Sequence, residues 1–405
     1  MNKRAVWLGI GWFLGIQPFS WAEQAIEFGV ELSADATVGL RGWAQTGESL
    51  HGLALIHGEW GNAPGDGGAS SCRAHVSILG LAGRGPTGRF VGDLLTISNS
   101  EGHESLRLYA SWWESNREAW NVRAGLLLAD EEFGYSDAGG ELINASFGWP
   151  IFISANTRNT GPAFFAAGLG VRIRWDLDDR RSFRIGFYDG DTLDSPEGDP
   201  AINRDGLRYR LNGEQGLFTM AEFNVRLAGR TRFKLGAWAH TGDFADLYRD
   251  PGGGSFVLNG TAPRVHPHNF GGYAVLEHAI VGTPGEQGGV DGYVRFGAAP
   301  PDRNAIHWAF DLGSAWHGPL PSRPEDVFTL GFSYARHSDS LRRASMEAEP
   351  SLAPPDYEHV IELAYRWTIS EALSVQPDLQ YIRHPGGSAM LRDALVLLVR
   401  VKAVF

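Results

Sequence analysis

The last eleven residues of the chain alternate strictly between two sets of side chains. Read back from the terminal residue, one set is Phe405, Ala403, Val401, Val399, Leu397 and Leu395, and the other is Val404, Lys402, Arg400, Leu398 and Val396. Because successive side chains of a β-strand point to opposite faces, the strand has one apolar face and one mixed face. The apolar face would meet a core in a soluble sandwich, or lipid in a transmembrane barrel whose mixed face lines a lumen.

The first 22 residues have the features of a secretory signal peptide. Lys3 and Arg4 form a positive start, and the apolar stretch 5–16 is too short to span a bilayer. Residues 20–22, Ser-Trp-Ala, fit a cleavage site. An uncleaved anchor is the alternative, but the longest later apolar run, 394–399, has only six residues. The sequence therefore predicts an exported chain, which is either a soluble protein or a closed barrel.

Charge and cysteine content exclude several classes of protein. The formal net charge of −12 becomes −14 without Lys3 and Arg4, which disfavours a nucleic-acid partner. Cys72 is the single cysteine, so no intramolecular disulfide forms. The thirteen histidines lack metal-ligand spacing, and no hydrolase or phosphate-loop motif is present. We expect neither an enzyme nor a cofactor.

Alternation recurs along the whole chain after the leader. The clearest segments are 106–113, 120–126, 167–175, 183–187, 219–227, 233–240, 306–313, 328–334 and 361–367. Weaker candidates lie near 26–42, 50–58, 73–81, 142–149, 270–280, 290–298 and 373–382. Together with the terminal strand they predict about sixteen strands and an all-β fold over residues 23–405. We interpret it as a transmembrane antiparallel β-barrel with short periplasmic turns and longer external loops.

Two details favour a barrel over a soluble sandwich. The polar members of each alternating segment are often charged residues or glycine, which suit a wet lumen better than a core. Aromatic residues gather at the ends of the apolar rows, as in the interfacial girdles of a membrane barrel. These residues are Trp112, Trp120, Trp175, Tyr334, Tyr365, Trp367 and Phe405.

The same alternation predicts which charged side chains face the lumen. They are Arg107, Arg123, Arg172, Arg174, Arg184, Arg226, Arg232, Glu222, Asp311, Glu362 and Asp378. Trp113 and Trp238 fall on the same face and would offer rings for stacking against a solute. The alternative for each charged residue is a structural ion pair that stiffens the barrel wall. A polar-lined pore that binds solutes weakly is the functional interpretation.

Segment 129–148 interrupts the alternation and is rich in acidic residues, among them Glu131 and Glu132. One interpretation is a loop that folds into the barrel and narrows the pore, and the other is an exterior loop. A glycosidase pair is disfavoured, because two carboxylates must flank one glycosidic bond and adjacent residues of an extended chain point apart.

Several blocks of sequence resemble the carbohydrate-selective porin family (OprB-like). The most specific is 376–382, Gln-Pro-Asp-Leu-Gln-Tyr-Ile, followed by 385–387, Pro-Gly-Gly. Other blocks are 358–365, 393–396 and Phe405, and upstream 92–93, 98–99, 106–109, 142–148, 170–175 and 187–190. Residues 23–90 match weakly, and Leu128 and Asp130 stand where the family has acidic and amide residues.

The resemblance implies a 16-stranded outer-membrane barrel that passes sugars by diffusion. Its partners would be mono- or oligosaccharides and the surrounding outer-membrane lipid, and the barrel would be a monomer or a homotrimer. A general small-solute channel is the first alternative, and an exported glycan-active β protein is the second. The preferred sugar and the residues of the constriction do not follow from the sequence.

Overall fold

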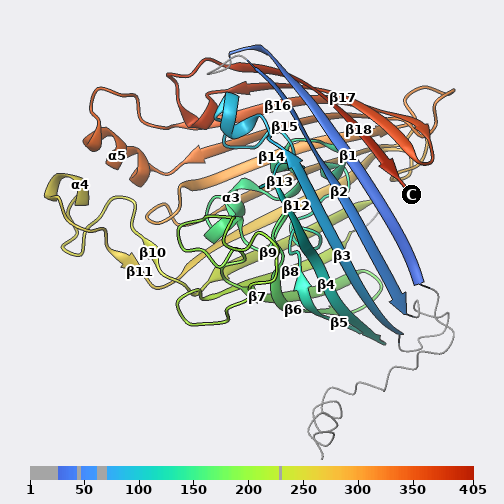
Figure 1. The fold of residues 1–405 in the computed structure, drawn as a ribbon, viewed down its shortest axis with the longest axis horizontal. Helices are drawn as coiled ribbons and strands as arrows, with labels where there is room; N and C mark the ends of the chain where they lie inside the picture. The colour runs from blue at the N-terminus through green and yellow to red at the C-terminus, as the bar shows by residue number, and fades with distance from the viewer. Residues whose placement is uncertain (1–25, 43–46, 62–70, 228–229) are drawn as a thin grey trace, which may run out of the picture.

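The computed structural model describes residues 26–42, 47–61, 71–227 and 230–405. Within them sixteen antiparallel strands close into one barrel, in the order β1-β18-β17-β16-β15-β14-β13-β12-β9-β8-β7-β6-β5-β4-β3-β2 (Figure 1). The first strand therefore pairs with both the second and the last. The predicted fold class and strand number are confirmed. The predicted leader, residues 1–22, lies outside the described residues.

The barrel strands have the following bounds: β1 Ile26–Arg41, β2 Glu48–Gly61, β3 Ser71–Gly83, β4 Ser105–Arg117, β5 Trp120–Leu127, β6 Gly168–Asp176, β7 Arg181–Asp189, β8 Leu217–Arg226, β9 Thr231–His240, β12 Asn269–Val281, β13 Val290–Ala298, β14 Ile306–His317, β15 Val327–His337, β16 Tyr357–Ser370, β17 Leu373–Arg383 and β18 Ala394–Val404. A separate two-stranded sheet consists of β10 Phe244–Ala245 and β11 Val265–His266.

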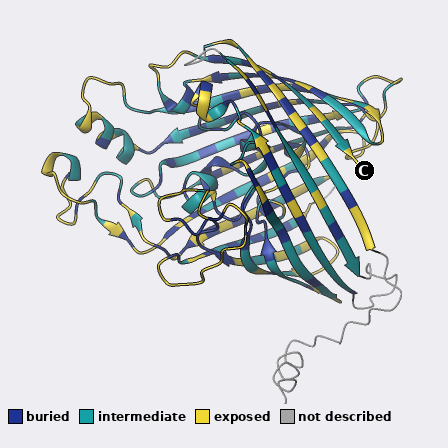
Figure 2. Cartoon of the chain, in the orientation of Figure 1, coloured by how far each residue is buried: buried dark blue, intermediate teal, exposed yellow. Residues whose placement is uncertain are grey.

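The two faces of each strand differ as the alternation predicts. On β18, Leu397 and Val401 are exposed on the outside of the barrel, whereas Val396 and Leu398 are fully buried inside it. Figure 2 shows the same banding of exposed and buried residues along the strands. Apolar side chains that follow one another along the outside of a closed barrel form the band that faces lipid, so the outer face is the lipid face.

The two ends of the barrel differ in the length of their connections. Turns 118–119, 177–180 and 371–372 lie at one end, together with the C-terminus. Connections 84–104, 128–167, 190–216 and 241–268 lie at the other end. The first end is the periplasmic one, because outer-membrane barrels have short periplasmic turns and longer external loops.

A β-bulge in β4 shifts the alternation of that strand. The pairing with β3 steps from Ser77 to Ile78 while β4 skips Tyr109. Residues before the bulge keep the predicted faces, and those after it exchange them. The assignment of Trp113 to the lumen is therefore wrong, because Trp112 points inward and Trp113 points to the lipid.

Short helical turns lie within the long connections. They are η1 Thr87–Val91, η2 Gly139–Glu141, α2 Ala145–Gly148, α3 Ile151–Ser154, η3 Arg158–Thr160, α4 Phe256–Asn259 and η4 Pro385–Gly387; the longest helix is α5 Asp339–Ala348. The weak strand candidate at 142–149 is wrong, because the Asn144 side chain caps α2 there by accepting from the Ser146 amide. No helix in the described part of the chain is long and apolar enough to cross a bilayer.

Candidate functional site

Segment 128–167, the connection between β5 and β6, folds into the barrel and packs against the inner wall. Phe133, Phe147 and Phe152 of this segment are fully buried. They belong to one apolar cluster with Tyr273 and Tyr293, which project inward from β12 and β13. Of the two interpretations left open by the sequence, the inserted loop is confirmed.

Arg295, a residue of the wall strand β13, anchors this segment to the barrel wall. Its two terminal nitrogens donate to four backbone carbonyls, those of Gly134 (2.6 Å), Ser146 (2.7 Å), Phe147 (3.0 Å) and Gly148 (3.0 Å). The Nε of Arg295 donates to the Asp311 carboxylate at 2.9 Å. A buried guanidinium with all of these acceptors satisfied fixes the backbone of the segment in one position.

Inward-pointing carboxylates accept the backbone amides of the same segment. Glu362 of β16 accepts from the Ile143 amide at 2.6 Å and the Asn144 amide at 2.8 Å. Glu222 of β8 accepts from the Gly134 amide at 2.8 Å. Both carboxylates are almost fully buried. They are structural groups that position the segment.

The connection 84–104 also folds inward, beside the inserted segment. The Asn99 amide donates to the Ile143 carbonyl at 2.8 Å, which joins the two segments. On the wall, Glu358 accepts from the Leu94 and Leu95 amides at 2.7 and 2.8 Å. These contacts hold connection 84–104 against the inner face of β16.

The opposite part of the wall carries a network of ion pairs across four adjacent strands. Glu114 of β4 pairs with Arg73 at 2.7 Å, with Arg123 at 2.8 Å and with Arg172 at 3.2 Å. Glu132 of the inserted segment pairs with Arg123 at 3.1 Å and with Arg172 at 2.6 Å. The network therefore links the inserted segment to the wall through ion pairs.

Trp112 lies at the edge of this network. Its ring stacks on His75 with centroids 4.9 Å apart, and the Arg123 guanidinium lies 4.0 Å from its centroid. Neighbouring side chains thus pack against this ring. Trp238, the other predicted stacking residue, is 2% exposed within the apolar cluster, so its prediction as a solute contact is wrong.

A cavity of about 630 Å³ lies between the inserted segment and the wall of β6–β9. Its lining carries both signs of charge: Glu131, Glu132, Asp137, Asp176, Asp178 and Asp179 against Arg174, Arg180, Arg181, Arg184, Arg226, Arg232 and Lys234. Tyr135 is the aromatic residue in this lining, and it is 36% exposed. Smaller cavities of about 420 and 260 Å³ continue along the same side of the segment, next to Glu141.

The predicted site residues fall into three groups. Those that line the cavity are Glu131, Glu132, Arg174, Arg184, Arg226 and Arg232. Those that face inward but are occupied by protein contacts are Arg107, Arg123, Arg172, Glu222, Trp238, Asp311, Glu362 and Asp378. Trp113 faces outward. The sequence analysis did not identify Tyr135 and Lys234 as lining residues, although Lys234 occupies a polar position of an alternating segment.

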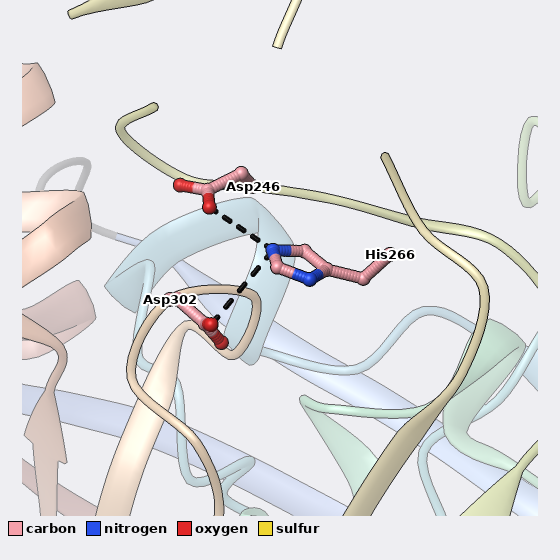
Figure 3. A group of neighbouring side chains, drawn as sticks. All are labelled: Asp246, His266 and Asp302. Atoms are coloured by element: carbon pink, nitrogen blue, oxygen red, sulfur yellow. Dashed lines mark hydrogen bonds and ion pairs between the residues drawn. The ribbon is translucent and has the colours of Figure 1, made fainter. Parts of the chain in front are cut away.

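Asp246, His266 and Asp302 gather in the external connections, and their side chains point toward one another (Figure 3). His266 Nε2 lies 3.0 Å from Asp246 and 3.8 Å from Asp302. Burial would raise the pKa of Asp246, but hydrogen bonds from backbone amides, His266 and Arg264 lower it overall. Arg264 and Arg303 already neutralise the carboxylates of Asp246 and Asp302. The group therefore fits a set of ion pairs between loops better than a metal site.

A closed sixteen-stranded barrel with an apolar outer face and a charged interior narrowed by an inserted segment is an outer-membrane porin. The protein lies in the outer membrane and crosses it with these strands. The chain belongs to the carbohydrate-selective porins of the OprB family, whose family model matches residues 67–405.

Known outer-membrane proteins are similar to this chain in sequence or in fold. Porin B of Pseudomonas aeruginosa is 24% identical over 185 residues, which cover 43% of this chain and 41% of that protein. The match thus spans less than half of the relative's length. The high-pH structure of Pseudomonas putida OprB is 18% identical and covers 94% of both chains, with a TM-score of 0.80. The channel DcaP of Acinetobacter baumannii is 12% identical over 95% of this chain and 99% of its own, with a TM-score of 0.57.

Proposed function

We propose that the protein carries sugars passively across the outer membrane, through the charged cavity beside segment 128–167. The observation that carries this proposal is the cavity of about 630 Å³, whose lining has mixed charge and includes the partly exposed Tyr135. Family membership supports sugars as the solute class. The proposal assigns solute contact to Tyr135, Glu131, Arg174 and Arg226, and a structural role to the buried charges.

The lining suits a neutral polyhydroxyl solute. Guanidinium groups donate and carboxylates accept, so both kinds of hydrogen bond are available to a hydroxyl group. Tyr135 adds a ring face for the C–H side of a pyranose. Its backbone is held in place, since the Lys234 ammonium donates to the Tyr135 carbonyl. Exposed, solvated groups bind weakly, as release on the far side requires.

Opposite charges in the cavity are arranged in pairs. Arg232 lies 3.2 Å from Asp137 of the inserted segment, and Lys234 lies 3.0 Å from Glu277 of β12. Such pairs set up a local field that orients dipolar solutes without attracting a net charge. Glu132 is committed to two arginines, so Glu131 and Glu132 do not form a free catalytic couple, and we propose a channel without enzymatic activity.

A general small-solute channel is the second candidate, favoured by the many charged side chains in the lining. Liposome swelling with sugars and with zwitterionic amino acids of similar size separates the two. Sugar selectivity predicts faster swelling with sugars, and equal rates would support the general channel.

A pair of variants tests the solute contact. Tyr135→Ala should reduce the sugar-induced block of single-channel current severalfold, whereas Tyr135→Phe, which keeps the ring, should leave it near the wild-type value. An unchanged block in Tyr135→Ala would remove this residue from the proposal.

We also propose that residues 1–22 are cleaved, so N-terminal sequencing of the envelope protein should begin at Glu23.

A further inference from the structure

Aromatic side chains cover the lipid face of β14–β16 at the external end of the barrel. Trp308 and Tyr334 stack with ring centroids 5.1 Å apart, and Tyr334 stacks on Tyr357 at 5.3 Å. Phe332 lies 5.4 Å from His359 in the same patch. Aromatic rings at this depth mark the level of the lipid headgroups.

Two exposed arginines lie beside this patch. Arg41 ends β1 and pairs in register with Leu395 of β18, which in turn pairs with Tyr381 of β17. Arg383 ends β17 and pairs with His359 of β16. Since Glu358 and Ile382 are buried inside the barrel, His359 and Arg383 point outward. Arg41 shares the outward face of Leu395.

The two arginines are close enough to act together. β1 and β17 are separated only by β18, and a strand spacing of about 4.8 Å places the two backbones about 10 Å apart. The charges of Arg41 and Arg383 both act on the Tyr381 phenol. Asp393 is the acidic group here, and it already accepts from the Tyr381 hydroxyl at 2.6 Å. The two guanidiniums form no hydrogen bond or ion pair with the described part of the chain, although the charge of Arg383 acts on the Asp393 carboxylate.

Directly below the arginines the outer face is purely apolar. Val38, Leu379 and Leu397 are each about two-fifths exposed on β1, β17 and β18. The surface thus combines a cationic pair, an aromatic rim and an apolar band in the order in which a membrane lipid presents its headgroup and chains. A two-fold contact with a second copy of this chain fits less well, because it would bring the same arginines against each other.

We propose that this surface, which combines Arg41 and Arg383 with the aromatic patch and the apolar band, binds a phosphorylated glycolipid of the outer leaflet. Its phosphate would lie between Arg41 and Arg383, its sugar against the aromatic patch, and its acyl chains along β1, β18 and β17. Two guanidiniums without a hydrogen bond or ion pair among the described residues match a phosphate monoester in charge and in donor geometry. The site is on the outside of the barrel and is independent of solute passage.

Binding of diphosphoryl lipid A to the detergent-purified protein tests the proposal. Arg41→Gln and Arg383→Gln should each weaken binding about fivefold, and the double variant about 25-fold, from the usual contribution of one basic residue near a lipid surface. Arg208→Gln, the same change in an exposed external loop between β7 and β8, is the matched control and should bind as the wild type does.

Three further measurements keep the outcome decisive. Arg41→Lys with Arg383→Lys should retain most of the binding, and heat-modifiable migration should show that every variant is folded. Enzymatically dephosphorylated lipid A should bind the wild type as weakly as diphosphoryl lipid A binds the double variant. Equal binding of the two lipids, an unaffected double variant, or displacement of lipid A by inorganic phosphate at comparable concentration would overturn the proposal.

Discussion

Arg295 and Asp311 form a buried ion pair between neighbouring strands β13 and β14, with 2.9 Å between Nε and the carboxylate. The remaining nitrogens of Arg295 donate to carbonyls of the inserted segment, so one side chain joins wall, segment and counter-ion. Such a group holds a constriction in place without touching the solute.

Arg295→Met should therefore destabilise the protein and loosen the constriction. Removal of one partner leaves Asp311 buried without its counter-charge, which costs about 3–5 kcal/mol. The measurements are the urea midpoint in detergent and the single-channel conductance, with Arg343→Met on the exposed face of α5 as the control. We expect a lower midpoint and a larger, noisier conductance. A variant with wild-type values of both would contradict the anchoring role.

Arg232→Gln should shift the ion selectivity of the pore toward cations. Arg232 lines the cavity and pairs with Asp137, so its loss leaves a net negative charge beside the passage. One charge at about 8 Å in water changes the energy of a passing ion by about 0.5 kcal/mol, or about twofold in permeability ratio. Reversal potentials in a salt gradient measure this ratio. A shift toward anions, or an equal shift in Arg208→Gln, would be inconsistent with the assigned lining.

The alternation of the sequence predicted the barrel because the two faces of each strand meet different surroundings. One face meets lipid and the other meets water or packed polar groups, so side-chain polarity alternates with a period of two residues along every strand. It could not predict the bulge at Tyr109, which exchanges the faces of Trp112 and Trp113. It also placed Glu222, Asp311 and Glu362 correctly on the inner face but not their function. Glu222 and Glu362 accept from backbone amides of segment 128–167, and Asp311 pairs with Arg295, which donates to carbonyls of that segment. The segment lies far away in the chain, and no periodicity records such contacts.

The connection 84–104 should become less stable as the pH rises. Burial and the neighbouring Asp93 carboxylate raise the pKa of Glu101 to about 8. Since the ordinary value is 4.5, the folded form binds the proton more tightly than the unfolded form. The stabilisation is complete below about pH 4.5 and is lost as the pH rises through about 8.

Hydrogen exchange of residues 84–104 between pH 4.5 and 9, corrected for intrinsic exchange rates, measures this effect. Glu101→Gln keeps a neutral side chain and should flatten the pH dependence of protection, whereas Glu197→Gln in another external loop should leave it unchanged. Protection that rises with pH in the wild type would show that the sign is wrong.

Phe405 should be required for efficient assembly. Its backbone amide donates to the Val30 carbonyl at 2.9 Å and its carbonyl accepts from the Val30 amide at 3.0 Å, at the seam where the last strand meets the first. The ring is 72% exposed toward the lipid. Phe405→Gln places a polar group there and should lower the amount of heat-modifiable protein in the envelope severalfold, while Phe405→Tyr should be tolerated. Unchanged amounts in Phe405→Gln would refute this role.

The most direct test of sugar passage is the current through single molecules of the purified protein in planar bilayers, titrated with a panel of mono- and disaccharides. We predict discrete conductance steps that at least one sugar reduces in a saturable manner. The absence of steps, or steps that no sugar changes, would contradict the proposal that sugars cross through the charged cavity.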